Sequence, residues 1–226
     1  DRPSIFYSQT WQHMSGVRVE ATPLVDRLGN AAERKNPGQA LLVLPGGVWG
    51  SLTASSRREV LLQIRGWIGF YHCTRWDAQL TELEPSITAS QFVALVGDRD
   101  IWAAGFSRSR AYVDRDMHGA ICSGPTQYFG SPASRIRLRV YDKAAEAGWD
   151  VPAIRHELQF RKAPADQHFR RLCERLRLQA HQEDDDMTAE HEVVGWALAQ
   201  HADYRDTSAW KNREFPKNWR QYARVC

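Results

Sequence analysis

The sequence predicts an α+β domain in which a mostly antiparallel sheet carries helices on one face and a candidate active site on the other. Three observations predict this architecture. Residues 74–82, 135–143 and 153–161 alternate between apolar and polar side chains, as half-buried strands do. Apolar residues recur at helical spacing in the segments between and after them. A Ser-Pro-Ala-Ser sequence at 131–134 is typical of a turn and predicts a hairpin.

The first third of the chain predicts two strands, a loop and a helix. The strands are predicted at residues 17–20 and 40–44, and the loop is predicted at residues 29–38. The helix follows because apolar residues recur at helical spacing from Val60 to Tyr71. Either Thr53 or Ser56 can cap this helix, and Ser56 with Glu59 would form a capping box.

The remaining helices follow the first and the last of the alternating segments. Thr88 and Gln91 form a capping-box pattern that opens a helix through Leu95. Residues 98–122 indicate strands only weakly. Pro164 suits the first turn of a helix, and a further helix is marked by Val193, Val194, Ala197 and Leu198. We therefore expect the sheet and its helices in residues 1–163, and a helical segment of the same domain in residues 164–226.

Composition narrows the class of protein. The 226 residues are 42% hydrophobic and 25% charged, which is ordinary for a soluble globular chain. No apolar run reaches about 18 residues, and no signal peptide opens the chain, so no membrane partner is expected. Cys73, Cys122, Cys173 and Cys226 lack metal-ligand spacing, and we interpret them as reduced thiols of a cytoplasmic protein. Because the chain begins at Asp1 without a Met, we expect an N-terminal piece to be missing.

The formal charge of +3 is carried mostly by arginine. Lysines are few: Lys35, Lys143, Lys162, Lys211 and Lys217. The planar guanidinium binds phosphate with a fork of donors, so this bias favours a nucleic-acid partner. A GC-rich genome would produce the same bias, and both explanations stay open.

The polar faces of the three alternating segments carry an unusual set of residues. If the segments share a sheet, that face gathers Arg75, Asp77, Arg137, Arg139, Tyr141, Lys143, Arg155 and Glu157. The carboxylates offer hard oxygens to a divalent metal. Nearby cations favour a phenolate nucleophile, and Arg137, Arg139 and Lys143 are placed to act on Tyr141. This set suits phosphoryl transfer, although ordinary cross-strand pairs on a solvated face explain the same pattern.

Three blocks of sequence, in order, resemble one family. The central block is Tyr128-Phe129-Gly130-Ser131, then Ser134, then Arg139-Val140-Tyr141-Asp142-Lys143. Upstream stands Thr74-Arg75-Trp76-Asp77, and downstream stands Ile154-Arg155-His156-Glu157-Leu158. Together they resemble the Rep_trans family of rolling-circle replication initiators from plasmids and phages, with related relaxases. The resemblance covers roughly residues 52–161.

The resemblance implies a reaction and a set of residues. Tyr141 would attack a phosphodiester at a rolling-circle origin, leaving a 5′-phosphotyrosine link and a free 3′-OH, with Arg139 and Lys143 beside it. Asp77 and Glu157 would hold Mg²⁺ or Mn²⁺. Our candidate DNA contacts are Arg75, Arg137, Arg155, Ser131 and Ser134. We expect single-stranded or extruded origin DNA as the partner, with a helicase and a second copy of the chain as further candidates.

Several points depart from the family pattern or stay open. A second acid is common four residues after the first, but Thr81 stands there, with Glu82 next to it. Tyr128 is a rival nucleophile, and His156 lies on the apolar face, where a core role is expected. Two other functions are considered: a conjugative relaxase with the same chemistry, and a non-catalytic DNA-binding protein.

Overall fold

The computed structural model describes residues 9–12, 17–22, 39–66, 72–114, 117–118, 124–178 and 188–206. The predicted loop at 29–38 lies outside these ranges. The chain forms two compact units, Asp1–Leu61 and Leu62–Cys226. The sequence-based boundary between residues 163 and 164 coincides with the start of a helix inside the second unit. No described helix has the length and apolar character that a membrane span requires.

The first unit is built on a small antiparallel sheet. Its strands run in the order β1 (Gln9–Gln12), β2 (Arg18–Thr22) and β3 (Gln39–Val43). Two helices follow, α1 (Gly46–Ser51) and α2 (Ala54–Gly66), the latter continuing into the second unit. Thr53 caps α2, since its hydroxyl accepts a hydrogen bond from the Ser56 backbone N–H at 3.1 Å. The alternative cap at Ser56 is therefore not the one used.

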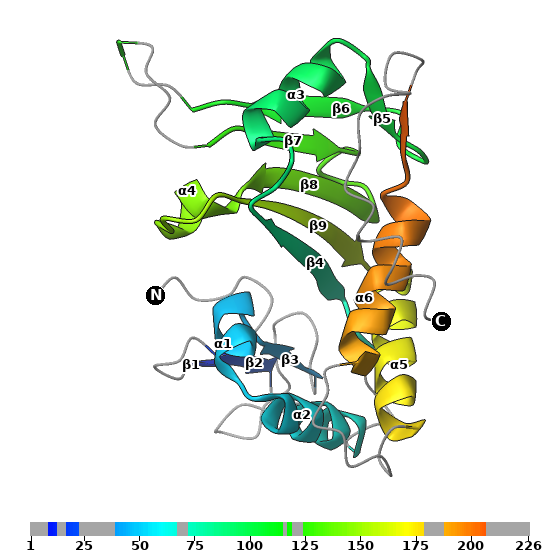
Figure 1. Ribbon diagram of the computed structural model, residues 1–226. Coiled ribbons are helices and arrows are strands. Elements are labelled where there is room, and N and C mark those ends of the chain that lie inside the picture. Colours follow the sequence, from blue (N-terminus) through cyan, green and yellow to red (C-terminus); the bar gives the residue numbers. More distant parts are fainter. Residues whose placement is uncertain are drawn as a thin grey trace. The chain divides into compact units, whose positions relative to one another are not determined.

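The second unit is built on a five-stranded antiparallel sheet (Figure 1). The strand order is β4 (Arg75–Leu83), β9 (Ala153–Arg161), β8 (Ile136–Asp142), β7 (Thr126–Phe129) and β6 (Ser109–Tyr112). The three alternating segments of the sequence are thus its three neighbouring strands β4, β9 and β8. A two-stranded ladder of β5 (Ile101–Ala103) and β10 (Tyr204–Asp206) adds to this unit. The predicted α+β class is confirmed.

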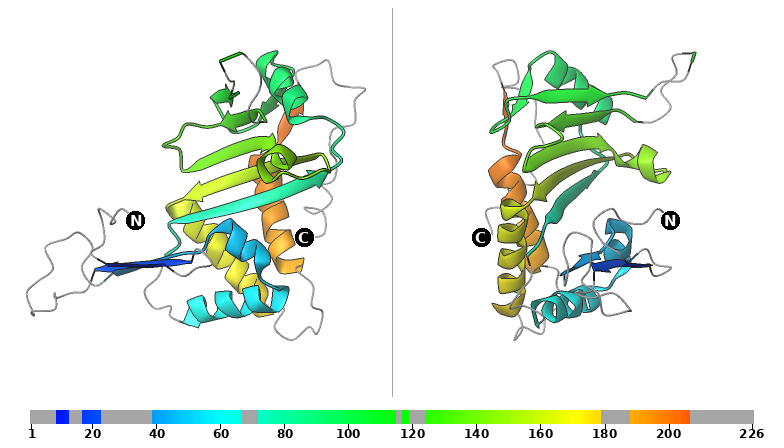
Figure 2. Two further views of the ribbon diagram at one scale, coloured as in Figure 1. Left: turned by 90° about the vertical axis from the view of Figure 1, so that its left-hand side faces the viewer. Right: turned by 180° about the vertical axis from the view of Figure 1, so that it is seen from behind.

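Helices cover one face of the five-stranded sheet. They are α3 (Ala89–Gly97), α5 (Ala163–Leu178) and α6 (Thr188–His201), and Figure 2 shows α5 and α6 along one side of it. The ring of Phe92 in α3 meets Phe129 edge-on at 6.4 Å. In α5, His168 stacks on Trp76 at 5.6 Å between ring centroids. These apolar contacts place the hydrophobic core between the helices and this face.

Local signals account for where the helices begin and end. Thr88 and Gln91 form the predicted capping box of α3: each side chain accepts a hydrogen bond from the other residue's backbone N–H. The short helix α4 (Lys143–Ala147) begins where the Asp142 side chain accepts from the Ala145 N–H at 2.8 Å. It ends at Gly148, whose φ of 66° favours glycine.

Candidate active site

Strand register places most of the predicted site residues on the sheet face opposite the helices. Across β8 and β9, Arg139 pairs with Glu157 and Tyr141 pairs with Arg155. Directly opposed residues of antiparallel strands share a face. With the β4–β9 and β7–β8 registers, this face carries Asp77, Gln79, Thr81, Tyr128, Arg137, Arg139, Tyr141, Arg155, Glu157 and Gln159. We refer to it as the open face.

Three side chains meet at the centre of the open face. The Tyr141 hydroxyl lies 3.4 Å from Oε2 of Glu157, a long hydrogen bond in which the phenol donates. Nη2 of Arg139 donates to the same oxygen at 2.7 Å. The Arg139 guanidinium also lies over the Tyr141 ring, 4.1 Å from its centroid. Gln159 completes the contacts of Glu157 by donating to Oε1 at 3.2 Å.

The phenol of Tyr141 is held in its neutral form. Tyr141 is buried, and this burial raises its pKa above the ordinary 10.0. The negative charge of Glu157 raises the pKa further, while Arg139 and Arg155 oppose both effects without overcoming them. Arg139 therefore lowers the pKa of this phenol as expected, but burial and Glu157 outweigh it, so the net shift in the protein without DNA is upward.

The other two cations expected beside Tyr141 are engaged elsewhere. Lys143 begins α4, where its ammonium forms an ion pair with Glu146 and lies 5.7 Å from the centroid of the Trp149 ring. Arg137 lies over the ring of Tyr128 at 3.9 Å. Arg155, directly opposite Tyr141 in the register, was expected only as a DNA contact. Its Nε donates to Thr81 at 2.8 Å, and its Nη1 donates to Gln79 at 3.1 Å.

Asp77 lies on the open face but is paired with its neighbour Arg75. Nε of Arg75 donates to Oδ1 at 3.0 Å, and Nη2 donates to Oδ2 at 2.6 Å. The position four residues after Asp77 is Thr81, which points to the open face. Glu82 pairs with Ile154, a residue of the buried face, so Glu82 cannot stand beside Asp77 as a second acid.

A divalent metal would find two carboxylates on this face. In the part of the chain that is described, no group of three or more His, Cys, Asp or Glu side chains could hold a metal ion. Mg²⁺ is nevertheless commonly bound by one or two carboxylates completed by water and substrate phosphates. Asp77 and Glu157 fit that pattern, although Arg75, Arg139 and Gln159 now occupy their oxygens.

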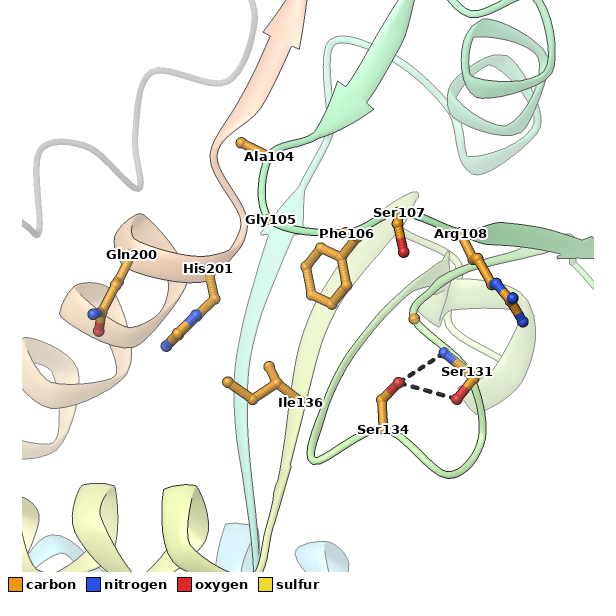
Figure 3. A pocket seen from close by; sticks show the side chains of 11 residues that line it. Ala104, Gly105, Phe106, Ser107, Arg108, Ser131, Ser134, Ile136, Gln200 and His201 are labelled. Atoms are coloured by element: carbon orange, nitrogen blue, oxygen red, sulfur yellow. Dashed lines mark hydrogen bonds between the residues drawn. The ribbon is translucent and has the colours of Figure 1, made fainter.

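Ser131 and Ser134 lie away from Tyr141, beside a hollow of about 450 Å³ (Figure 3). The hollow is also lined by Ile136, on the helix-covered face, and by His201 of α6. Oγ of Ser134 accepts from the Ser131 N–H at 3.0 Å and contacts the Ser131 hydroxyl at 3.1 Å. These bonds shape the hairpin turn, and the structure does not bring the two serines together with the tyrosine.

Two side chains of this site were not among the predicted site residues. Gln159 contacts Glu157, and Gln79 contacts Arg155. Both lie on the open face by the same alternation that selected the charged residues. They were overlooked because neutral amides carry no charge pattern.

Comparison with known proteins supports the fold. No protein-family profile and no curated protein sequence matches the chain. The solved structure of the rolling circle replication initiator protein from Geobacillus stearothermophilus matches with a TM-score of 0.61 and 19% sequence identity. The match covers 94% of this chain and 73% of that chain. The protein therefore has the fold of a rolling-circle replication initiator, while its chemistry has to be argued from the site.

Proposed function

We propose that the protein nicks one strand of DNA by transesterification, with Tyr141 as the nucleophile, as a rolling-circle replication initiator. The observation that carries the proposal is the contact of the Tyr141 hydroxyl with Glu157, 3.4 Å apart. Around this contact the open face presents arginines, which suit a polyanionic substrate. The replication-initiator fold supports the same reaction class.

In the proposed step, Oη of Tyr141 attacks the phosphorus and the bond to the 3′ oxygen breaks. The phenol proton passes to Glu157, whose Oε2 it already faces. The leaving 3′ oxygen takes a proton from water and becomes the free 3′-OH, while the 5′ phosphate stays on the tyrosine. Since burial raises the pKa of Tyr141, the proton leaves during the attack rather than before it.

Arg139 is proposed to act twice in this step. Its hydrogen bond at 2.7 Å orients the Glu157 carboxylate toward the phenol. Its position over the Tyr141 ring also brings positive charge close to the attacked phosphate, where charge develops in the transition state. Asp77 and Glu157 would hold Mg²⁺ or Mn²⁺, which supplies positive charge to the phosphate oxygens when bound.

The test is a pair of matched substitutions on neighbouring strands. Tyr141→Phe should abolish the covalent adduct with labelled single-stranded oligonucleotides in Mn²⁺ while retaining DNA binding. Tyr128→Phe, which removes another phenol hydroxyl of the open face, should retain the adduct. Mass spectrometry of the adduct peptide identifies the linked residue. An adduct that survives in Tyr141→Phe would refute the assignment.

One alternative has its own support in the geometry. The raised pKa of Tyr141 and the arginine-bound carboxylates also suit a non-catalytic DNA-binding protein on this fold. Such a protein would bind single-stranded DNA yet form no adduct in any divalent metal. The wild-type chain in the same assay separates the two functions. A conjugative relaxase would share the chemistry and differ in its DNA substrate.

A further inference from the structure

Arg137 is a cation for which the described part of the chain supplies no anion. It is only partly exposed, and its Nε is shielded from solvent without a hydrogen-bond partner. Its guanidinium lies 3.9 Å from the centroid of the Tyr128 ring. Among the described residues no carboxylate forms an ion pair with it. A shielded cation without a counter-ion is costly, so the site favours an anion from outside the protein.

The surroundings of Arg137 are positively charged as well. Burial lowers its pKa, as do the charges of Arg161, Arg139 and Arg110, whereas Tyr128 alone opposes this change. Arg139 is neutralised by Glu157, whereas the Arg161 guanidinium donates to the carbonyl of Pro132 and forms no ion pair with a carboxylate among the described residues. Register places Arg110 directly opposite Tyr128, so this group of arginines spans several strands of the open face.

Arg137 and the proposed nucleophile Tyr141 lie at different positions along β8. Arg137 and Tyr141 are four residues apart in one strand, which corresponds to about 14 Å at ~3.4 Å per residue. This is the separation of the two backbone positions, so the two side chains start from different points along the strand. We therefore assign the anion bound by Arg137 to a different group from the one that Tyr141 would attack.

We propose that Arg137, with Arg110 and Arg161, binds a phosphate of single-stranded DNA that flanks the phosphate attacked by Tyr141. This proposal deepens the proposed function and rests on it. The guanidinium fork offers paired donors that match phosphate oxygens. The aromatic ring beside the basic group is typical of surfaces that bind single strands. The experiment below also tests the alternative that this site binds double-stranded DNA.

Tyr128 acts in this proposal as a positioning residue. Its ring supports the guanidinium of Arg137 from one side. The hydroxyl is not required, so Tyr128→Phe should preserve the site. Tyr128→Leu removes the aromatic face and should weaken binding in the same direction as loss of Arg137 itself.

The experiment measures binding of a fluorescein-labelled single-stranded oligothymidylate to the full chain across a series of KCl concentrations. All variants carry Tyr141→Phe, so that no adduct forms. Arg137→Met should weaken binding about tenfold, the effect of losing one hydrogen-bonded charge contact. The slope of log K against log salt should become shallower by about 0.7, the value for one phosphate on a single strand. Arg137→Lys should retain the slope with reduced affinity.

The matched control is Arg171→Met, which removes the same charge from α5 on the helix-covered side, where Arg171 lies 3.8 Å from the Trp196 ring. It should leave the affinity and the slope nearly unchanged. The proposal is overturned if Arg137→Met behaves like this control. It is also overturned if the loss is as large on the annealed duplex as on the single strand. Failure of the nicking reaction would appear separately, as a wild-type chain that forms no adduct while its binding still depends on Arg137.

Discussion

Replacing Glu157 with Gln tests whether the ion pair between Arg139 and Glu157, at the centre of the open face, stabilises the folded protein. The Arg139 and Glu157 side chains are 27% and 8% exposed, so their pair at 2.7 Å is largely shielded from water. The substitution leaves Arg139 without its counter-ion, and Nε of that arginine already lacks a partner. Breaking a buried pair from one side costs about 3–5 kcal/mol, and partial exposure of Arg139 reduces the expected cost to about 2–3 kcal/mol.

The assay is thermal unfolding followed by circular dichroism. At about 2–4 °C per kcal/mol for a chain of this size, Glu157→Gln should lower Tm by roughly 5–10 °C. Arg139→Met should be costly for the reciprocal reason, because it strands the Glu157 carboxylate. The double variant should lose about 1–2 kcal/mol less than the sum of the single losses, because neither charge is then left alone.

An exposed pair in the same sheet provides the control. Arg75 and Asp77 are 55% and 31% exposed at the side chain, so Asp77→Asn should cost less than about 1 kcal/mol. If Glu157→Gln unfolds within about 1 °C of the wild type, or if the two single losses simply add, the reasoning fails. The ion pair between Arg139 and Glu157 would then orient the two side chains without stabilising the fold.

Two further predictions concern the fold that carries the site. Burial lowers the pKa of His156 from 6.5 to about 4, so the unfolded chain binds a proton at His156 that the folded chain does not bind; the contribution of His156 to stability should fall by about 3 kcal/mol as the pH drops from 6.5 to 4. Urea unfolding across this window should show a shallower fall in His156→Leu, and an unchanged fall would contradict the assignment. Gly130→Ala should cost about 1–2 kcal/mol, because φ is 85° and the new Cβ would stand 3.1 Å from the Ile136 carbonyl oxygen. Gly148→Ala, with φ at 66° and open space around it, should cost less in the same measurement.

The open face could be predicted from sequence because alternation is a local property. Consecutive side chains in a strand point to opposite faces, whatever the neighbouring strands are. The assignment of Tyr141 and Glu157 to one face therefore needed only that their segments form strands of one sheet. The strand order could not be predicted from such a local pattern, because pairing β4 with β9 joins segments that lie far apart in the sequence.

The net rise in the pKa of Tyr141 has a cause that the sequence does not show. Arg139 lowers this pKa as expected, but burial of the phenol, which is the largest effect, and the charge of Glu157 raise it more. Directly opposed side chains on neighbouring strands have Cβ atoms about 4.5–5.5 Å apart, closer than residues two apart along one strand. Arg137, Arg139 and Lys143 were predicted beside Tyr141, and the register adds Arg155 opposite it. Lys143 was misplaced because Asp142 ends the strand by capping α4, a signal visible in the sequence but not used.

The distribution of charge along β8 implies an order of events. Arg139 and Glu157 neutralise each other, and Arg75 neutralises Asp77, so a phosphate that reaches Tyr141 must compete with ion pairs that are already formed. Arg137 forms no such pair among the described residues, so a phosphate can bind there without breaking an existing ion pair. Capture of the flanking phosphate should therefore precede rearrangement at the tyrosine. If this order holds, Arg137→Met raises KM for nicking more than it lowers kcat, whereas Glu157→Gln lowers kcat.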